Sequence, residues 1–229
     1  MRDSDTVPLI SVVIPTLNEE GYLPSTLASV QGARGLELIV VDGGSTDDTV
    51  RIARSSGAFV VHSEPGRARQ MNEGARVARG SMLLFLHADT RVPRGFAERV
   101  RRTLADESVA AGAFGLRIEG PRWSLRVVER LVRWRCRWFG LPYGDQALFM
   151  RAPTFHGAGG YPQQPIMEDF DLVRRLRRLG RIQVVSEMVE TSGRRWLKRG
   201  VGRVTLLNQV IILAYVLGIG PERLARWRR

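Results

Sequence analysis

The chain has 229 residues, of which 44% are hydrophobic, enough for the core of one large α/β domain or two small ones. Its formal net charge is +12, and arginine carries almost all of the positive charge, with Lys198 the only lysine. This balance favours anionic partners such as phosphates, nucleic acid or an acidic membrane face, and the single cysteine, Cys136, excludes an internal disulfide.

The first residues, MRDSDTVPL, are polar and acidic, whereas a signal peptide begins with basic residues and continues with apolar ones. The sequence therefore predicts a cytoplasmic protein. Nucleic-acid binding would fit the charge, but no recognition motif accompanies it, so we expect no nucleic-acid partner.

Strand-like and helix-like segments alternate in the first half of the chain. The predicted strands are 10–14, 36–41, 59–62 and 82–86, and the predicted helices are 22–30, 46–55 and 68–78. Ser45 is the predicted N-cap of the second helix, and Gly80 is the predicted C-cap of the third. The alternation predicts an α/β fold with an open, mostly parallel sheet and helices on both faces.

The second half of the chain is less regular. A strand is predicted at 109–118 and a helix at 123–138, and residues 140–160 read as a loop with a short strand at 147–150. A further helix is predicted at 170–179, ended by Gly180. The helix at 123–138 carries five large apolar residues on one stripe and is rich in arginine on another face. The stripe consists of Trp123, Val127, Leu131, Trp134 and Trp138.

We expect one domain over residues 1–190 and a helical appendage over residues 191–229. The appendage holds nine basic residues and one acidic residue, a net charge of +8. Its apolar centre, 204–220, is interrupted by polar residues and is too short to span a membrane. It is suited either to lie on an anionic membrane surface or to pack on the domain or in a homodimer.

Carboxylates stand at the ends of two of the predicted strands. Asp42 follows the strand at 36–41, and Asp89 follows the strand at 82–86. Glu168 and Asp169 stand far downstream, at the start of an amphipathic helix. In an open parallel sheet, ligands bind beyond the carboxyl ends of the strands, so the sequence predicts a nucleotide-sugar pocket at this edge.

Six motifs occur in the order and spacing of one known family. They are SVVIPTLNEE, VVDGGSTDDT, GRARQMNEGARVARG, HADT, GGYP and MEDFDLVRRLRRLGR, and they extend roughly over residues 9–181. In this respect the chain resembles the inverting family-2 glycosyltransferases of GT-A fold, which is Rossmann-like. GDQALF and the SGRRW segment are similar to a bacterial subgroup labelled as arsenosugar-biosynthesis-type transferases, a naming analogy that fixes no substrate.

The resemblance implies transfer of a sugar from a UDP- or GDP-linked donor to an acceptor hydroxyl, on either a lipid-linked or a small molecule. The alternative of another class is a catalytically decayed module that only binds a nucleotide sugar or a membrane surface. A nucleotidyltransferase would normally carry a Gly- and Lys-rich loop after the first strand, and SVVIPTLNEE lacks it.

The resemblance also implies the roles of the carboxylates. Asp169 matches the catalytic base, and Glu168 would orient the site. Asp89 matches the last residue of the family's DxD motif and would bind Mg²⁺ or Mn²⁺ at the diphosphate. The motif here reads His87-Ala88-Asp89, so His87 would join the metal, contact ribose, or only pack at the strand end. Asp42 would accept hydrogen bonds from the nucleotide base, or simply form an Asx turn.

The remaining expected donor contacts are loop residues near these carboxylates. Arg67, Arg194 and Arg195 are candidates for contact with the diphosphate. The glutamine that opens the motif of processive relatives is absent before Arg195 and Trp196, so we expect no processivity. The full predicted nucleotide-sugar set is Pro15, Thr16, Asn18, Glu19, Asp42, Gly43, Arg67, Asn72, His87, Ala88, Asp145, Gln146, Gly160, Arg195 and Trp196.

Overall fold

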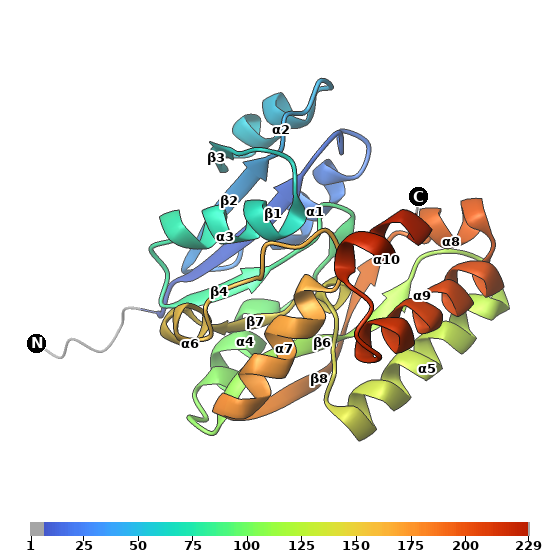
Figure 1. The fold of residues 1–229 in the computed structure, drawn as a ribbon. Coiled ribbons are helices and arrows are strands. Elements are labelled where there is room, and N and C mark those ends of the chain that lie inside the picture. The colour runs from blue at the N-terminus through green and yellow to red at the C-terminus, as the bar shows by residue number, and fades with distance from the viewer. Residues whose placement is uncertain (1–6, 229) are drawn as a thin grey trace, which may run out of the picture.

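The computed structural model describes residues 7–228, so the start of the acidic segment used to predict cytoplasmic location lies outside the described residues. Eight strands form one sheet, with helices on both faces (Figure 1). The strands are β1 (Ile10–Thr16), β2 (Leu36–Asp42), β3 (Phe59–His62), β4 (Met82–Phe85), β5 (Thr90–Arg91), β6 (Val109–Ile118), β7 (Phe149–Arg151) and β8 (Arg181–Thr191). Their order across the sheet is β3-β2-β1-β4-β7-β6-β8-β5.

The helices connect these strands and extend the chain beyond the last one. They are α1 (Leu23–Val30), α2 (Thr49–Ser55), α3 (Arg67–Val77), α4 (Phe96–Leu104), α5 (Trp123–Phe139), α6 (Ala152–Gly157), α7 (Glu168–Leu179), α8 (Arg194–Arg199), α9 (Val201–Val216) and α10 (Pro221–Arg228). A 3₁₀ turn at Gly144–Gln146 precedes β7.

The first half of the sheet follows the predicted alternation. Strands β3, β2, β1 and β4 run parallel, and the register pairs Thr16 with Asp42 at the carboxyl ends of β1 and β2. These runs are almost continuously apolar because helices cover both faces of the central strands. The prediction of an α/β sheet is therefore confirmed, and it places the loops after β1, β2 and β4 at one edge.

The second half of the sheet is mixed, with both parallel and antiparallel neighbours. Strand β7 is antiparallel to both β4 and β6, and β5 is antiparallel to β8, whereas β6 and β8 are parallel.

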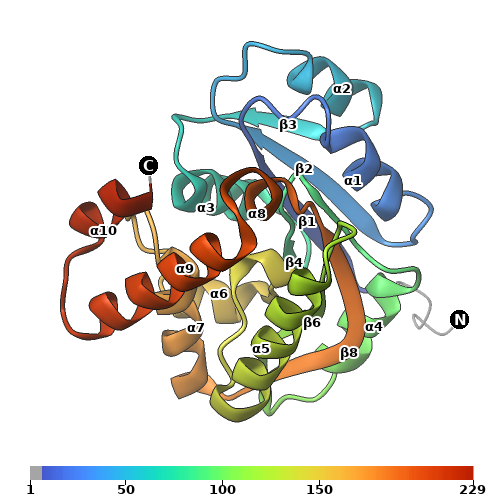
Figure 2. The same cartoon turned by 90° about the vertical axis from the view of Figure 1, so that its right-hand side faces the viewer.

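Two apolar layers cover the sheet. On one face, Val12 and Ile14 of β1 pack with residues of α1, α4 and α5, including Leu23, Val100 and Leu125. On the other face, Val13 packs with α3, α6 and α7. Successive residues of a strand point to opposite faces, so one strand supplies both layers. Figure 2 shows α1 and α4 to the right of the sheet and α3, α6 and α7 to its left.

Several predicted boundaries are corrected by hydrogen bonding in the loops. Helix α2 begins at Thr49, and Ser45 is not its N-cap, because the Ser45 hydroxyl instead accepts a hydrogen bond of 2.9 Å from the Asn18 N–H. Helix α3 ends before Ala78. Gly80 serves close packing, since a Cβ at this position would lie 2.7 Å from the Ser11 backbone nitrogen.

Some other elements were predicted from the sequence only in part, and some were not predicted. The short strand expected at 147–150 is β7 at Phe149–Arg151, and α6 lies within the segment that was expected to be loop. Helix α4 and strands β5 and β8 were not predicted. The helix expected at 170–179 begins two residues earlier, so that Glu168 and Asp169 belong to its first turn.

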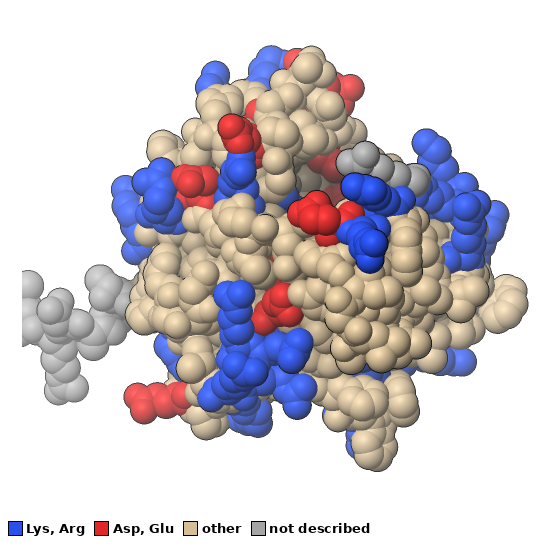
Figure 3. Space-filling model, in the orientation of Figure 1, with Lys and Arg blue, Asp and Glu red and all other residues tan. Residues whose placement is uncertain are grey.

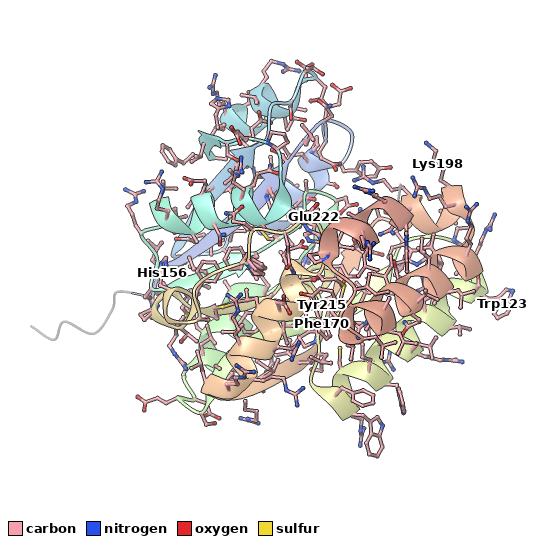
Figure 4. All side chains as sticks on the ribbon, viewed as in Figure 1. Trp123, His156, Phe170, Lys198, Tyr215 and Glu222 are labelled. Carbon is pink, nitrogen blue, oxygen red and sulfur yellow. The ribbon has the colours of Figure 1, made fainter. Side chains whose placement is uncertain are left out.

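Helix α5 has a second apolar face, which points to solvent. Leu125, Val128 and Cys136 are buried against the domain. The predicted stripe lies on the other side of the helix and is exposed, with Trp123 78% and Trp138 69% exposed. Figure 4 shows Trp123 projecting away from the outer end of the helix. An exposed aromatic stripe of this kind is not explained by the fold of the chain itself.

The helices after β8 pack back on the domain. Helix α9 lies beside α5, and buried residues of α9 and α10, such as Ile211 and Leu224, cluster with Ile166. Tyr215 of α9 packs edge-to-face on Phe170 of α7, as seen in Figure 4, and its hydroxyl donates to Asp171. Within residues 7–228 no helix is long and apolar enough to cross a membrane. The division at residue 191 remains a prediction.

Gly112 is expected to be intolerant of a side chain. A Cβ at Gly112 would lie 2.2 Å from the ring of Phe149, which is fully buried and has no room to move. Gly112→Ala should lower the free energy of unfolding by about 1–3 kcal/mol, the usual cost of overpacking. Gly202→Ala is the control, because this exposed helical glycine meets nothing within 4 Å and should gain roughly 0.5–1 kcal/mol. Equal urea denaturation curves for the Gly112 variant and the parent would contradict the packing.

Candidate active site

A cavity of about 540 Å³ lies beyond the carboxyl ends of β1 and β4. Eleven of the residues predicted to form the site line it. They are Pro15, Thr16, Glu19, Arg67, His87, Ala88, Asp89, Asp145, Asp169, Arg195 and Trp196. The structure therefore brings together segments that are far apart in the sequence, at the edge of the sheet where ligands of parallel α/β proteins bind.

A cation from the C-terminal helices lies beside Asp89. The Arg194 guanidinium is 3.3 Å from Asp89, donates two hydrogen bonds of 2.9 and 2.6 Å to Glu19, and stacks 4.4 Å from the centre of the Tyr22 ring. Burial raises the pKa of Asp89, and the charge of Arg194 acts in the opposite direction. A positive charge near the end of β4 therefore stabilises the ionised form of Asp89.

A second ion pair joins α3 to α7 beside the cavity. Arg67, the first residue of α3, donates to Glu168, the first residue of α7. Glu168 is only 1% exposed, and burial raises the pKa of its carboxyl group. Its second oxygen, Oε2, has no hydrogen-bond partner among residues 7–228. Glu168 does not line the cavity itself, so it acts on the cavity through Arg67.

Asp169 is held by backbone groups. Its Oδ2 accepts a hydrogen bond of 2.8 Å from Gly144 N–H, and its Oδ1 accepts one of 2.8 Å from Phe170 N–H. A Cβ on Gly144 would lie 3.2 Å from His87 Nε2 and 3.4 Å from Asp169 Oδ2. The absence of a side chain at Gly144 therefore allows His87 and Asp169 to approach the same point of the cavity wall.

The turn at Gly144–Gln146 contains two of the predicted site residues, Asp145 and Gln146, which have different surroundings. Asp145 lines the cavity, burial raises its pKa, and its Oδ1 has no hydrogen-bond partner within the described part of the chain. Gln146 is buried and holds the turn, because its Nε2 donates to Phe114 O at 2.9 Å and its Oε1 accepts from Tyr143 N–H at 3.2 Å. The structure therefore gives Gln146 a structural role and Asp145 a free acceptor.

Other predicted donor contacts are placed outside the cavity lining. Asp42 accepts hydrogen bonds from Gly44 and Ser45 N–H at 3.0 and 3.1 Å, which is the Asx turn that the sequence left open, and Gly43 lies in that turn. Asn18 accepts a hydrogen bond of 2.9 Å from Thr46 N–H and joins the loops after β1 and β2. These residues shape the edge of the sheet.

Asn72 and Gly160 form a clamp between α3 and the loop after α6. Asn72 donates to Tyr161 O at 2.8 Å and accepts from Tyr161 N–H at 2.9 Å, so both ends of its amide are used. Gly160 has a φ of +64°, and a Cβ there would lie 2.8 Å from Asn72 Oδ1. The GGYP motif is therefore fixed by Asn72, and neither Asn72 nor Gly160 lines the cavity.

Sequence reasoning missed two parts of the cavity. One is Gln70 of α3, which donates to Thr16 O at 2.7 Å and to Val41 O at 2.8 Å and so ties β1 to β2 beneath the cavity. The other is a wall between α5 and α9, whose position no local pattern could reveal. Its lining residues include Val128, Val132, Asn208, Gln209, Ile211 and Ile212.

The comparisons with known proteins identify the class and then the family. The described fold is that of GT-A glycosyltransferases: the mannosyltransferase PcManGT from Pyrobaculum calidifontis, solved in complex with GDP-Man and Mn²⁺, superposes with a TM-score of 0.70 at 20% identity, covering 98% of this chain and 71% of that one. The family model of glycosyl transferase family 2 matches residues 11–161. The chain belongs to this family.

Two further relatives are similar over smaller shares. A PGL/p-HBAD biosynthesis glycosyltransferase from Mycobacterium tuberculosis is 41% identical over 91 residues, which are 36% of this chain and 36% of that protein. The glucosyl-3-phosphoglycerate synthase GpgS from Mycobacterium tuberculosis superposes with a TM-score of 0.55 at 25% identity, covering 81% of this chain and 70% of that one. The chain thus spans about a third of the length of the first curated relatives.

Removing the Asn72 clamp should loosen the loop that carries GGYP. Asn72→Ala leaves the Tyr161 backbone groups without their partners and should lower the free energy of unfolding by about 1–3 kcal/mol. Gln209→Ala, at an exposed position of α9, is the control and should stay within roughly 0.5 kcal/mol of the parent. Both changes are measured by chemical denaturation, and an unchanged midpoint in Asn72→Ala would show that the clamp carries no stability.

Proposed function

We propose that the chain is an inverting glycosyltransferase that moves a sugar from a nucleotide diphosphate donor to an acceptor hydroxyl with the help of a divalent metal. The observation that carries the proposal is the convergence of the Asp169 carboxylate, Asp89 and Arg194 on one cavity. A carboxylate placed opposite a cationic region can accept a proton while negative charge develops on the leaving group.

The donor diphosphate would bind among the arginines of the cavity. Arg67, Arg194 and Arg195 line it from α3 and α8. In the structure Arg194 is neutralised by Glu19 and Asp89, so a diphosphate would compete with these carboxylates for the guanidinium. Bidentate contact of arginine with phosphate oxygens makes such an exchange favourable.

The donor set at the end of β4 fits a magnesium or manganese ion that keeps most of its shell for phosphate and water. Asp89 offers a hard carboxylate in the cavity, His87 stands two residues before it, and among residues 7–228 no group of three or more His, Cys, Asp or Glu side chains is placed to hold a metal. Mg²⁺ is typically held by one or two carboxylates plus substrate phosphates. When bound, the ion would neutralise charge on the departing diphosphate.

Support for this donor chemistry comes from relatives. GpgS was solved in complex with Mg²⁺ and uridine-diphosphate, and PcManGT in complex with GDP-Man and Mn²⁺. A UDP- or GDP-linked sugar is therefore the donor class to test first. A thermal-shift panel of UDP- and GDP-sugars with and without Mn²⁺ identifies the donor, because a ligand that binds only the folded state raises its apparent stability.

Asp169 would act as the base. The acceptor oxygen attacks the anomeric carbon as the bond to the diphosphate breaks on the opposite face, which inverts the configuration, and Asp169 takes the hydroxyl proton. Backbone N–H groups of Gly144 and Phe170 fix the carboxylate at 2.8 Å, so its position does not depend on the acceptor. A base positioned in this way contributes typically 10²- to 10⁴-fold to the rate.

Asp169→Asn should separate transfer from donor binding. The amide keeps the size of the side chain but cannot accept the proton, so the transfer rate should fall by roughly 10² or more while donor affinity stays near that of the parent. Asp171→Asn is the matched control, because Asp171 lies on the same helix but bonds Gln164 and Tyr215. A near-normal transfer rate in Asp169→Asn would exclude Asp169 as the base. Donor binding without turnover in the parent would favour the decayed binding module.

Asp89→Ala should abolish the metal dependence of donor binding. Loss of the carboxylate removes the one protein oxygen that we assign to the ion, so calorimetry should show the same weak affinity for the nucleoside diphosphate with and without Mn²⁺. His87→Ala tests the neighbouring imidazole in the same titration. An Mn²⁺-dependent affinity in Asp89→Ala equal to that of the parent would place the metal elsewhere.

A further inference from the structure

The exposed stripe of α5 has the pattern of an interfacial helix. Its five residues recur at intervals of three or four, which places them on one face of the helix. All five are exposed, from 39% for Val127 to 78% for Trp123. This face is opposite the one that packs on the domain, so no part of the described chain covers it.

Helix α9 adds a second exposed apolar row. Leu206, Val210, Leu213 and Leu217 also follow one another at intervals of three or four, and they are 67%, 43%, 61% and 75% exposed. The buried residues of α9, among them Ile211, lie on its other side. The exposed rows of α5 and α9 are together called the α5–α9 face below.

The two helices that carry the rows are neighbours. Helices α5 and α9 pack against each other, and both Figure 1 and Figure 2 show them side by side. In Figure 3 a continuous tan area covers α9 at the lower right, and basic side chains lie along its upper and right-hand borders. Apolar surface gathered in this way on one side marks an interaction site.

The exposed charges on α5 and α9 themselves have a single sign. On α5, Arg130, Arg133 and Arg137 follow the helical period next to the stripe and are exposed. The one acidic residue of α5, Glu129, is buried and paired with Arg126. Helices that lie in the interface of an anionic bilayer have this composition, with tryptophan and leucine on one face and arginine beside them.

We propose that the α5–α9 face docks on the surface of an anionic lipid bilayer. The arginines decide between this occupant and a second copy of the chain, because a symmetric pair would bring two sets of arginines around one contact, where they repel. Tryptophan rings suit the depth of lipid headgroups, and arginines bordering the apolar rows can reach lipid phosphates.

The position of the cavity adds a consequence that rests on the proposed function. Val128 and Val132 of α5 and Ile211 of α9 form part of the cavity wall, so the helices that dock also border the site that holds Asp169. An acceptor with an apolar chain, resident in the bilayer, would then reach the base between the helices that contact its membrane.

Vesicle binding of the full chain tests the docking. We expect co-sedimentation with phosphatidylcholine vesicles that contain phosphatidylglycerol, and little with phosphatidylcholine alone. Trp134→Ser/Trp138→Ser should weaken binding to the anionic vesicles by at least about tenfold, because two exposed rings no longer enter the interface. Arg130→Gln/Arg133→Gln should weaken it on the order of 30-fold at low salt and less at high salt.

The controls make the same changes elsewhere. Phe59→Ser removes an exposed aromatic ring from β3, and Arg34→Gln/Arg54→Gln removes two exposed arginines from the N-terminal half. Both should bind vesicles like the parent. If the control variants lose as much affinity as the α5 variants, or if the α5 variants lose none, the α5–α9 face is not the docking surface.

Two further outcomes overturn the proposal. One is equal binding of neutral and anionic vesicles or of neither, and the other is a dimer in sedimentation velocity that Trp134→Ser/Trp138→Ser dissociates without any vesicle binding. Donor titration of the same variants in solution separates the two hypotheses. Vesicle binding without donor binding would leave the docking in place and remove the glycosyltransferase function, and the reverse result would remove only the docking.

Discussion

The buried pair between Arg67 and Glu168 is the constraint on which the cavity depends. It joins the first residue of α3 to the first residue of α7, and Glu168 is almost fully buried. Removal of one partner from such a pair typically costs 3–5 kcal/mol, because the other charge stays buried and unpaired. The pair therefore fixes the first turn of α7, and with it Asp169, relative to α3.

The sequence predicted the first half of the fold well because local pattern and final environment agree there. Strands β1 to β4 are apolar runs that end at polar loops, and helices cover both faces, so the position of Asp89 at a strand end follows from the chain order. The second half was predicted less well because β7 and β8 pair through contacts distant in sequence. Periodicity identified the α5 stripe correctly as one face, but it could not show that this face points outward.

Side-chain roles were harder to predict than positions. Asp42 stands at the end of β2 as expected, yet its oxygens are used by the backbone of the following turn. Asn72 is similar, since its amide is fully occupied by Tyr161. A motif shows which residues are near the site, whereas the hydrogen bonds show which groups hold each side chain in place.

The arginines that give the chain its net charge of +12 lie in two different environments. Arginines that face the cavity, such as Arg67 and Arg194, are paired with carboxylates, so under the proposed function a diphosphate would compete with Glu168, Glu19 or Asp89 for them. The exposed arginines of α5 differ, because Arg130 and Arg133 form no ion pair with any residue among 7–228. Pairing makes the first set selective for a ligand that offers better geometry than a carboxylate, whereas the second set responds to any dense anionic surface.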